Sequence, residues 1–453
     1  MSLVFGTFPE WCRLRGACKL PARYLRIVLG CAAAGLTLSA SAAGPALPAD
    51  HGAVALNRLV AEALQNNPEI QAARKEREAA LERVAPAGAL DDPMLEAGLI
   101  SVPSNSWRLD REDMTMKMIG LSQRLPYPGK RGLREEVAAR EAQAAGYNYQ
   151  ETVNRVVRDL KLAYFDLGLV ITSTRLVENT RLIIEQLLRI AETRYAVGQG
   201  TQADVLKAQT QLSKMTDELI RLARERPMAE AELNRALGRG IDAAALLPEA
   251  ASLSEARLQL QALHEAALRA RPQLLALEQT IARNEKALEL AQKDYYPDFD
   301  VRFAYGQRET MPDGTRRADL VNFTVAINLP VWRERKLAPR VAEAQAMRDQ
   351  ARMIYEAQRN ELGAKLRQQV AAAEQSLRSA RLYRNEILPQ ARLTAEAALA
   401  AYKVGRADFM TLLDSQMAVL NYEIAHATAV TGYNKALAEI DLITGGPSFR
   451  TNQ

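Results

Sequence analysis

The chain has 453 residues, with 59 Lys and Arg side chains against 54 Asp and Glu, and it contains only three His. So few histidines exclude a His-rich metal centre. Residues 1–43 hold five of the basic residues and a single acid, so the remaining chain is almost neutral, which argues against a nucleic-acid-binding protein.

The N-terminal residues have the organisation of a secretory signal. A basic segment over residues 1–26 is followed by a short apolar run over 27–38 and by the small-residue motif Ala-Ser-Ala that ends at Ala42. This order predicts a cleaved signal peptide over residues 1–42. The alternative is a lipoprotein acylated at Cys31, which is the last of the three cysteines. No later stretch offers about 18 consecutive apolar residues, so we expect no membrane-spanning helix.

The chain after the signal contains an internal duplication. Three prolines recur at an offset of 204 residues, pairing Pro68 with Pro272, Pro93 with Pro297, and Pro126 with Pro330. The segments Tyr195–Gly198 and Tyr402–Gly405 share the sequence Tyr-x-Val-Gly at an offset of 207. Small motifs that repeat in one order predict two copies of one structural unit of roughly 200 residues.

Each repeat is expected to hold the same elements. The first repeat spans residues 43–257 and the second spans 258–447, followed by a C-terminal tail over 448–453. In the first we expect a helix over about 55–85, a β-hairpin over about 94–125, a long helix over about 133–196 and a return helix over about 202–237. In the second, these elements fall over about 258–294, 298–331, 338–403 and 408–443. The fold class is therefore mainly α, with long coiled-coil helices and a small β part.

The expected strands alternate between apolar and polar residues. Between Val321 and Leu329, apolar side chains alternate with Asn322, Thr324, Ala326 and Asn328. Such strands fit a membrane barrel with a watery interior, although a half-buried sheet in a soluble domain has the same pattern. Aromatic residues near the strand ends favour the barrel: Trp107, Tyr127, Tyr295, Tyr296 and Trp332. A barrel in lipid must close, and four strands are too few, so the pattern predicts an oligomer.

Over the whole chain after the signal, the sequence resembles the TolC-type outer-membrane factors of Gram-negative tripartite efflux systems. The resemblance rests on the duplicated unit, on the Leu-Pro pairs at Pro126 and Pro330, and on the two Tyr-x-Val-Gly turns. It implies a homotrimer whose twelve-stranded outer-membrane β-barrel continues as a periplasmic α-helical barrel. It also implies a duct without enzyme activity or cofactor. The implied partners are a periplasmic adaptor protein, an inner-membrane pump and outer-membrane lipid, with no nucleic acid.

Two segments look most like the heavy-metal branch of this family, whose pumps are of the resistance-nodulation-division (RND) type. They are Asp92-Pro93 and residues 123–131. The leading hypothesis is therefore a channel for heavy-metal cations such as copper and silver, or cobalt, zinc and cadmium. The same duct exporting drugs or other organic molecules is one alternative, and a periplasmic coiled-coil scaffold without a pore is another. The methionines near the first hairpin are either thioether contacts for soft cations or lipid-facing and core residues: Met94, Met114, Met116 and Met118.

The resemblance also points to candidate gate residues near the two turns. Acidic residues one or two turns into each return helix ring the closed mouth in the family, and the matching positions here are Asp204, Thr411 and Asp414. Three copies of Asp414 around a narrow axis would attract cations and repel one another. The simpler interpretation makes Asp204 a helix-terminus acid and Asp414 a solvated surface residue.

Two further residues are candidates for closing the mouth. Tyr402 matches a family tyrosine that helps to hold the mouth shut, although simple packing would explain it equally well. The matching basic residue is replaced by Ala407, which leaves neighbouring Arg406 as the candidate.

The turns themselves are candidate contacts with the adaptor protein. The resemblance assigns this role to Val197, Gly198, Val404 and Gly405. A plain helix stop is the alternative, because glycine suits the end of any helix. No metal-binding residue is assigned.

Overall fold

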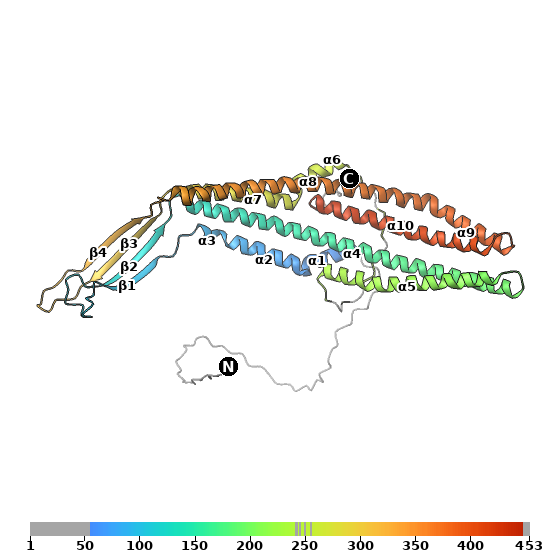
Figure 1. Ribbon diagram of the computed structural model, residues 1–453, viewed down its shortest axis with the longest axis horizontal. Coiled ribbons are helices and arrows are strands. Elements are labelled where there is room, and N and C mark those ends of the chain that lie inside the picture. Colours follow the sequence, from blue (N-terminus) through green and yellow to red (C-terminus); the bar gives the residue numbers. More distant parts are fainter. Residues whose placement is uncertain (1–54, 241–242, 244–245, 249–250, 254–255, 447–453) are drawn as a thin grey trace, which may run out of the picture. The chain divides into compact units, whose positions relative to one another are not determined.

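The computed structural model describes residues 55–446, except residues 241–242, 244–245, 249–250 and 254–255. The expected signal peptide over 1–42 and the tail over 448–453 therefore lie outside the described residues. Within the described residues the fold is mainly helical and contains one four-stranded antiparallel sheet (Figure 1). This confirms the expected mainly-α class with a small β part.

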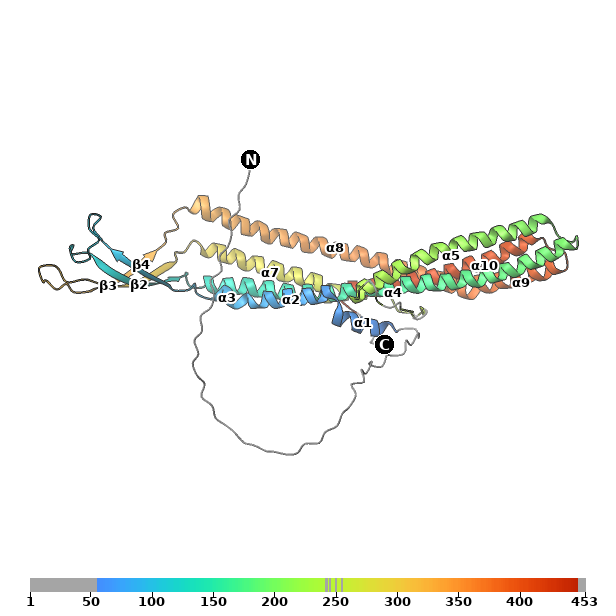
Figure 2. The same cartoon turned by 90° about the horizontal axis from the view of Figure 1, so that it is seen from below.

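The first repeat is built on α4 (Lys130–Ala196), a helix of 67 residues. At a rise of about 1.5 Å per residue, α4 is about 100 Å long. Helix α5 (Gln202–Leu237) returns beside it, as Figures 1 and 2 both show. Apolar side chains from α4, α5 and a short preceding helix form one core cluster. Five of its leucines are at most 1 % exposed: Leu59, Leu160, Leu167, Leu233 and Leu237.

The second repeat has a corresponding long helical path and return helix. Its elements are α8 (Ala338–Leu382), the π-helical segment η2 (Tyr383–Ile387), α9 (Leu388–Lys403) and α10 (Phe409–Ile443). The expected helix over 338–403 therefore contains one change of helix type. Pro389 lies in the first turn of α9 and has no N–H for the helical ladder, which accounts for the wider π turn before it.

Each repeat begins with shorter helices that are separated at the repeated proline. They are α1 (Leu56–Asn66), α2 (Pro68–Glu82) and α3 (Val84–Gly88) in the first repeat, and α6 (Leu260–Ala270) and α7 (Pro272–Lys293) in the second. The single helices expected over 55–85 and 258–294 are therefore interrupted. The physical reason is that proline disfavours helical backbone at the residue before it, and Asn67 and Arg271 are both extended.

The four strands lie at the end of the helices opposite the α4–α5 and α9–α10 turns (Figure 1). They are β1 (Met94–Ile100), β2 (Met116–Leu125), β3 (Phe299–Gln307) and β4 (Leu320–Ile327). The strands pair in the order β1-β2-β3-β4, so the central pair joins the two repeats. Among the described residues, β1 and β4 each have one edge that pairs with no other strand.

The two faces of the sheet differ in polarity. One cross-strand row contains four large apolar side chains that are all exposed: Leu95 at 71 %, Leu121 at 50 %, Phe303 at 51 % and Phe323 at 68 %. The neighbouring row on the opposite face contains Ser122, Arg302 and Thr324, and Arg302 forms an ion pair with Glu96. The sheet therefore exposes an apolar face and a polar face.

The register decides which face of the sheet the methionines of the first hairpin occupy. In β2, Lys117, Ile119 and Leu121 share the face of Leu95, because Leu121 pairs with Leu95 and Ile119 with Ala97. Met116 and Met118 therefore lie on the polar face, while Met114 precedes the strand. Met116 is buried, and its sulfur lies so close to Gly306 that a side chain at position 306 would require the Met116 side chain to shift.

Candidate functional site

The α4–α5 and α9–α10 turns have the same backbone geometry. Gly198 and Gly405 have φ angles of 72° and 73°, a left-handed conformation that glycine adopts without steric cost. After each glycine, an amide returns to the preceding helix: Gln199 N–H donates to the Arg194 carbonyl at 2.8 Å, and Arg406 N–H to the Ala401 carbonyl at 2.9 Å. Val197 and Val404, beside the glycines, are 62 % and 68 % exposed. The four candidate tip residues thus form two matched, exposed turns.

The helices that follow these turns, α5 and α10, are each capped by one Asp and one Thr three residues apart. The order of the two residues along the chain is reversed between the two helices. At the start of α5, the Thr201 hydroxyl accepts from Asp204 N–H at 3.2 Å, and the Asp204 carboxylate accepts from Thr201 N–H at 3.3 Å. At the start of α10, Asp408 accepts from Thr411 N–H at 3.0 Å and also from the Thr411 hydroxyl. The hydrogen bonds from Thr411 hold the pKa of Asp408 below its usual range.

These caps change the interpretation of two candidate gate residues. The carboxylate of Asp204 is bound to its own helix terminus, as the simpler interpretation of that residue supposed. Thr411 is the partner of an acid that lies three residues earlier in the chain, Asp408. The sequence analysis missed Asp408, although Asp-x-x-Thr immediately before an apolar segment is a detectable helix-start signal.

Tyr402 is buried at the contact between the two helical hairpins. Its side chain is 4 % exposed, and its ring centre lies 5.6 Å from that of Phe409. Arg194, from the end of α4, donates to the Tyr402 carbonyl and places its guanidinium carbon 4.6 Å from the ring centre. Burial raises the pKa of the Tyr402 hydroxyl, which has no hydrogen-bond partner among the described residues.

The cation that contacts Tyr402 is therefore Arg194, and the sequence analysis proposed Arg406 instead. Arg406 is exposed, and within the described part of the chain its side chain makes no hydrogen bond or ion pair. The short Tyr-x-Val-Gly motif could not reveal Arg194, because Arg194 and Tyr402 are 208 residues apart and belong to different repeats.

Asp414 projects from α10 on the side opposite its packed residues. Leu412 and Leu413 are 0 % and 5 % exposed, whereas Asp414 is exposed. In the described residues no hydrogen bond or ion pair involves the Asp414 carboxylate. Its charge is therefore free to act on solutes or on neighbouring molecules.

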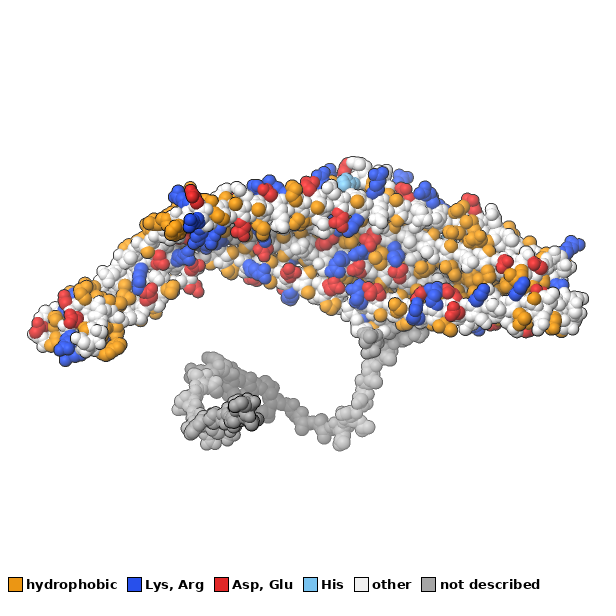
Figure 3. Space-filling view, viewed as in Figure 1, with side chains coloured by type: hydrophobic (Ala, Val, Ile, Leu, Met, Phe, Trp, Pro, Cys, Tyr) orange, Lys and Arg blue, Asp and Glu red, His pale blue; other side chains and the backbone are white. Residues whose placement is uncertain are grey.

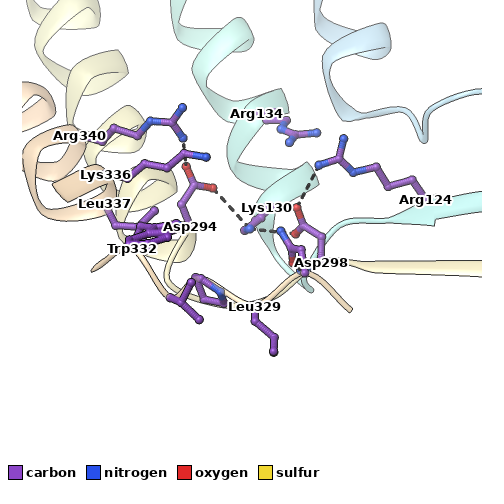
Figure 4. A pocket seen from close by; sticks show the side chains of 13 residues that line it. Arg124, Lys130, Arg134, Asp294, Asp298, Leu329, Trp332, Lys336, Leu337 and Arg340 are labelled. Carbon is purple, nitrogen blue, oxygen red and sulfur yellow. Dashed lines mark hydrogen bonds and ion pairs between the residues drawn. The ribbon is translucent and has the colours of Figure 1, made fainter. Parts of the chain in front are cut away.

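A second polar cluster lies where the sheet meets the helices (Figure 4). The Lys130 side chain is 3 % exposed, and its Nζ lies 2.9 Å from Asp298 and 3.4 Å from Asp294. Asp298 also accepts from Tyr127 N–H at 2.9 Å and pairs with Arg124 at 3.5 Å. Burial alone would raise the pKa of Asp298, but the hydrogen bonds from Lys130 and Tyr127 hold it below its usual range.

The cluster shows which contacts the segment over residues 123–131 makes in the structure. Arg124, Tyr127 and Lys130 from that segment all contact Asp298, which immediately precedes β3. The segment thus fixes the end of the first hairpin to the start of the second.

None of the helices that the structure describes is long and apolar enough to cross a membrane. The described residues also contain no group of three or more His, Cys, Asp or Glu side chains placed to hold a metal ion.

The comparison with protein families identifies the class of protein. The family model described as "Outer membrane efflux protein" matches residues 59–239 and 263–446. The chain therefore belongs to this family, whose members are transport channels rather than enzymes. A search of curated protein sequences gave no significant match.

Several solved structures have the same fold. The outer membrane protein VceC from Vibrio cholerae is 19 % identical, with a TM-score of 0.72 over 86 % of this chain and 96 % of VceC. The CmeC outer membrane channel of Campylobacter jejuni is 15 % identical, with a TM-score of 0.74 over 86 % of this chain and 85 % of CmeC. The open state of the MtrE outer membrane channel of Neisseria gonorrhoeae is 17 % identical, with a TM-score of 0.73 over 88 % of this chain and 90 % of MtrE.

Proposed function

We propose that this protein is the outer-membrane channel of a tripartite efflux system and works as a homotrimer. The observation that carries the proposal is the four-stranded sheet, with its exposed apolar face, its polar face and its two free edges. Unpaired strand edges are too costly to leave in lipid, because no water is present to satisfy them. Three copies would close twelve strands into one barrel, with the apolar face toward lipid and the polar face toward the lumen.

The helices then form the periplasmic part of the duct. The turns at Val197-Gly198 and Val404-Gly405 lie at the end of the helices away from the sheet, where their exposed valines suit contact with a periplasmic adaptor protein. Through the adaptor, the channel would receive substrate from an inner-membrane RND pump. The chain would reach the outer membrane after cleavage of the signal over residues 1–42, or as a lipoprotein acylated at Cys31.

The gate of the proposed duct lies near the same turns. Asp414 is exposed and unpaired in the described residues, so three copies could form a ring of carboxylates that attracts cations. The contact between Arg194 and Tyr402 holds the two helical hairpins of each protomer together beside that ring. Asp204 and Thr411 would contribute by fixing the starts of the two return helices.

The proposed cargo is heavy-metal cations. Besides the similarity of Asp92-Pro93 and residues 123–131 to the heavy-metal branch, three methionines lie on the polar face of the sheet, Met94, Met116 and Met118. Met94 is 66 % exposed, and a thioether facing the lumen is a ligand that soft cations accept. Organic molecules such as drugs are the second candidate cargo, since the duct would conduct them by the same route.

Two experiments test these proposals separately. Membrane fractionation and the heat-dependent mobility of an oligomer on gels would identify the channel, whereas a soluble periplasmic fraction would indicate a coiled-coil scaffold. A deletion strain exposed to copper, silver, cobalt, zinc, cadmium and a panel of hydrophobic drugs would identify the cargo. We expect sensitivity to one group of metal ions, and sensitivity to drugs alone would contradict the metal assignment.

A further inference from the structure

The two free edges of the sheet carry opposite charges at the same end. Asp91 and Asp92 lie just before Pro93, which precedes β1, and both acids are exposed. In the part of the chain that the structure describes, neither carboxylate has a hydrogen bond or ion pair. Because β1 starts and β4 finishes at the end of the sheet nearest the helices, this acidic pair lies level with the end of β4.

The end of β4 leads into a basic segment. Residues 333–340 contain Arg333, Arg335, Lys336 and Arg340 against a single acid, Glu334. The first three basic side chains are exposed and have no partner in the described residues, while Arg340 lies 3.9 Å from Asp294. In Figure 3, Lys and Arg side chains gather where the strands meet the helices.

Part of this basic segment lines a cavity of about 410 Å³ beside the Lys130 cluster (Figure 4). Five basic side chains and two acidic ones line the cavity, and both acids already pair with Lys130. Lys336 and Arg134 point toward this space without a partner among the described residues. The single chain therefore leaves a surplus of positive charge here, which carboxylates from outside the chain would neutralise.

We propose that Asp91 and Asp92 of one protomer bind the basic segment over residues 333–340 of the next protomer. The proposal rests on the trimer proposed above and specifies the contact that sets the register between its sheets. If β4 of one copy pairs with β1 of the next, the shared ladder ends at Pro330 on one strand and Pro93 on the other, because proline has no N–H to donate. Asp92 then lies beside the residues that follow Pro330.

A second copy of the chain suits both charged patches at once. The acids on the β1 edge and the bases after the β4 edge would meet three times around the trimer, and each copy would both give and receive the contact. Exposed apolar residues precede the basic segment, with Leu329 at 72 %, Val331 at 67 % and Trp332 at 67 % exposed. Pairing of the two edges would therefore bring apolar surface together as well as opposite charges.

Thiol cross-linking tests the proposed neighbours directly. No cysteine occurs after Cys31, so Asp92→Cys can be combined in turn with Arg333→Cys, Arg335→Cys or Lys336→Cys. With a short thiol-reactive cross-linker, at least one of these pairs should give covalent dimers and trimers, and the single variants should give none. The matched control is Asp113→Cys with the same partners, since Asp113 is an exposed acid near the other end of the sheet.

Reversing the charges of either side in the full-length protein tests how much this contact stabilises the trimer. Changing both Asp91 and Asp92 to Lys, or both Lys336 and Arg340 to Asp, should weaken assembly by about threefold or more per interface. Combining the two changes should restore most of the trimer. Loss of trimer from the basic-side change alone, with the acidic-side change silent, would overturn the proposal and indicate another anionic partner such as a lipid phosphate.

The outcomes separate this inference from the proposed function. A wild-type trimer in detergent that gives no cross-link at any of the three pairs would overturn the inference and leave the channel intact. A wild-type chain that is monomeric in detergent and in membranes would overturn both.

Discussion

Arg194 joins the two halves of the molecule at Tyr402. It donates a hydrogen bond to the Tyr402 carbonyl, and its guanidinium lies 4.6 Å from the centre of the Tyr402 ring. The first residue belongs to α4 of the first repeat and the second to α9 of the other. Because the contact lies beside the two turns, it couples the positions of the two helical hairpins at the proposed mouth of the duct.

Replacing Arg194 should therefore loosen the turns. Arg194→Ala removes a charged hydrogen bond and a cation–π contact, which together are worth about 2–4 kcal/mol. We expect faster hydrogen exchange in residues 195–205 and 402–410, and a higher single-channel conductance in planar bilayers. Arg406→Ala is the matched control, because Arg406 lies in the adjacent turn and has no side-chain partner in the described residues. Equal effects of the two variants would argue against a specific role for Arg194.

The sequence predicted the order of elements well because each depends on local signals. The return helix expected over 202–237 corresponds to α5 (Gln202–Leu237), which begins after a Thr cap and ends before Gly238 in a left-handed conformation. The repeated prolines indicate both the internal duplication and the positions where helices are interrupted, but only the duplication was predicted from them. The interruption of each first helix was therefore not predicted, although Pro68 and Pro272 are the first pair of repeated prolines.

The contacts within the candidate site were harder to predict. They join residues that are distant in sequence, such as Lys130 with Asp298, and no local pattern specifies them. The face on which the methionines lie could not be predicted for a related reason. Met116 and Met118 alternate with Lys117 and Ile119, so either set could have been the apolar face, and only pairing with β1 decides between them.

Exchange of the two helix caps offers a second prediction. Since α5 begins with Thr201 and Asp204 while α10 begins with Asp408 and Thr411, the double change Asp408→Thr with Thr411→Asp would give α10 the arrangement of α5. We expect this variant to unfold at nearly the wild-type temperature, whereas Asp408→Ala with Thr411→Ala should unfold at a lower one. If the exchanged variant were as unstable as the double alanine variant, the caps would not be equivalent.

The acid at this cap should also make stability depend on pH. The lowered pKa of Asp408 means that its contribution is fully present above the unfolded pKa of about 3.9 and is lost as pH falls through the folded value. Asp408→Asn keeps a good cap without a titrating group, so its unfolding temperature should vary less with pH below about 4 than that of the wild type. Thermal unfolding followed by circular dichroism across this range measures the difference.

The cluster at the sheet junction supports a third prediction. Lys130→Met leaves Asp298 buried without its closest cation, and loss of one partner from a buried pair costs about 3–5 kcal/mol. The double change Lys130→Met with Asp298→Leu should cost less than the single change, because the buried carboxylate is then removed together with its closest cation. Denaturant unfolding in detergent gives both values, and Arg131→Met, at an exposed neighbouring position, is the control. A single change that costs no more than the control would show that the pair contributes little.

The last prediction concerns the proposed carboxylate ring. If three Asp414 side chains surround the pore, Asp414→Asn should weaken block of the channel by divalent and trivalent cations by roughly fivefold, because the attraction depends on the summed charge. Conductance in planar bilayers at increasing cation concentration measures the block, and the effect should shrink at high salt as the charges are screened. Asp217→Asn is the matched control, since Asp217 is an exposed acid farther along the other return helix, α5. Unchanged block in Asp414→Asn would remove Asp414 from the gate, and equal loss in both variants would indicate a general surface-charge effect.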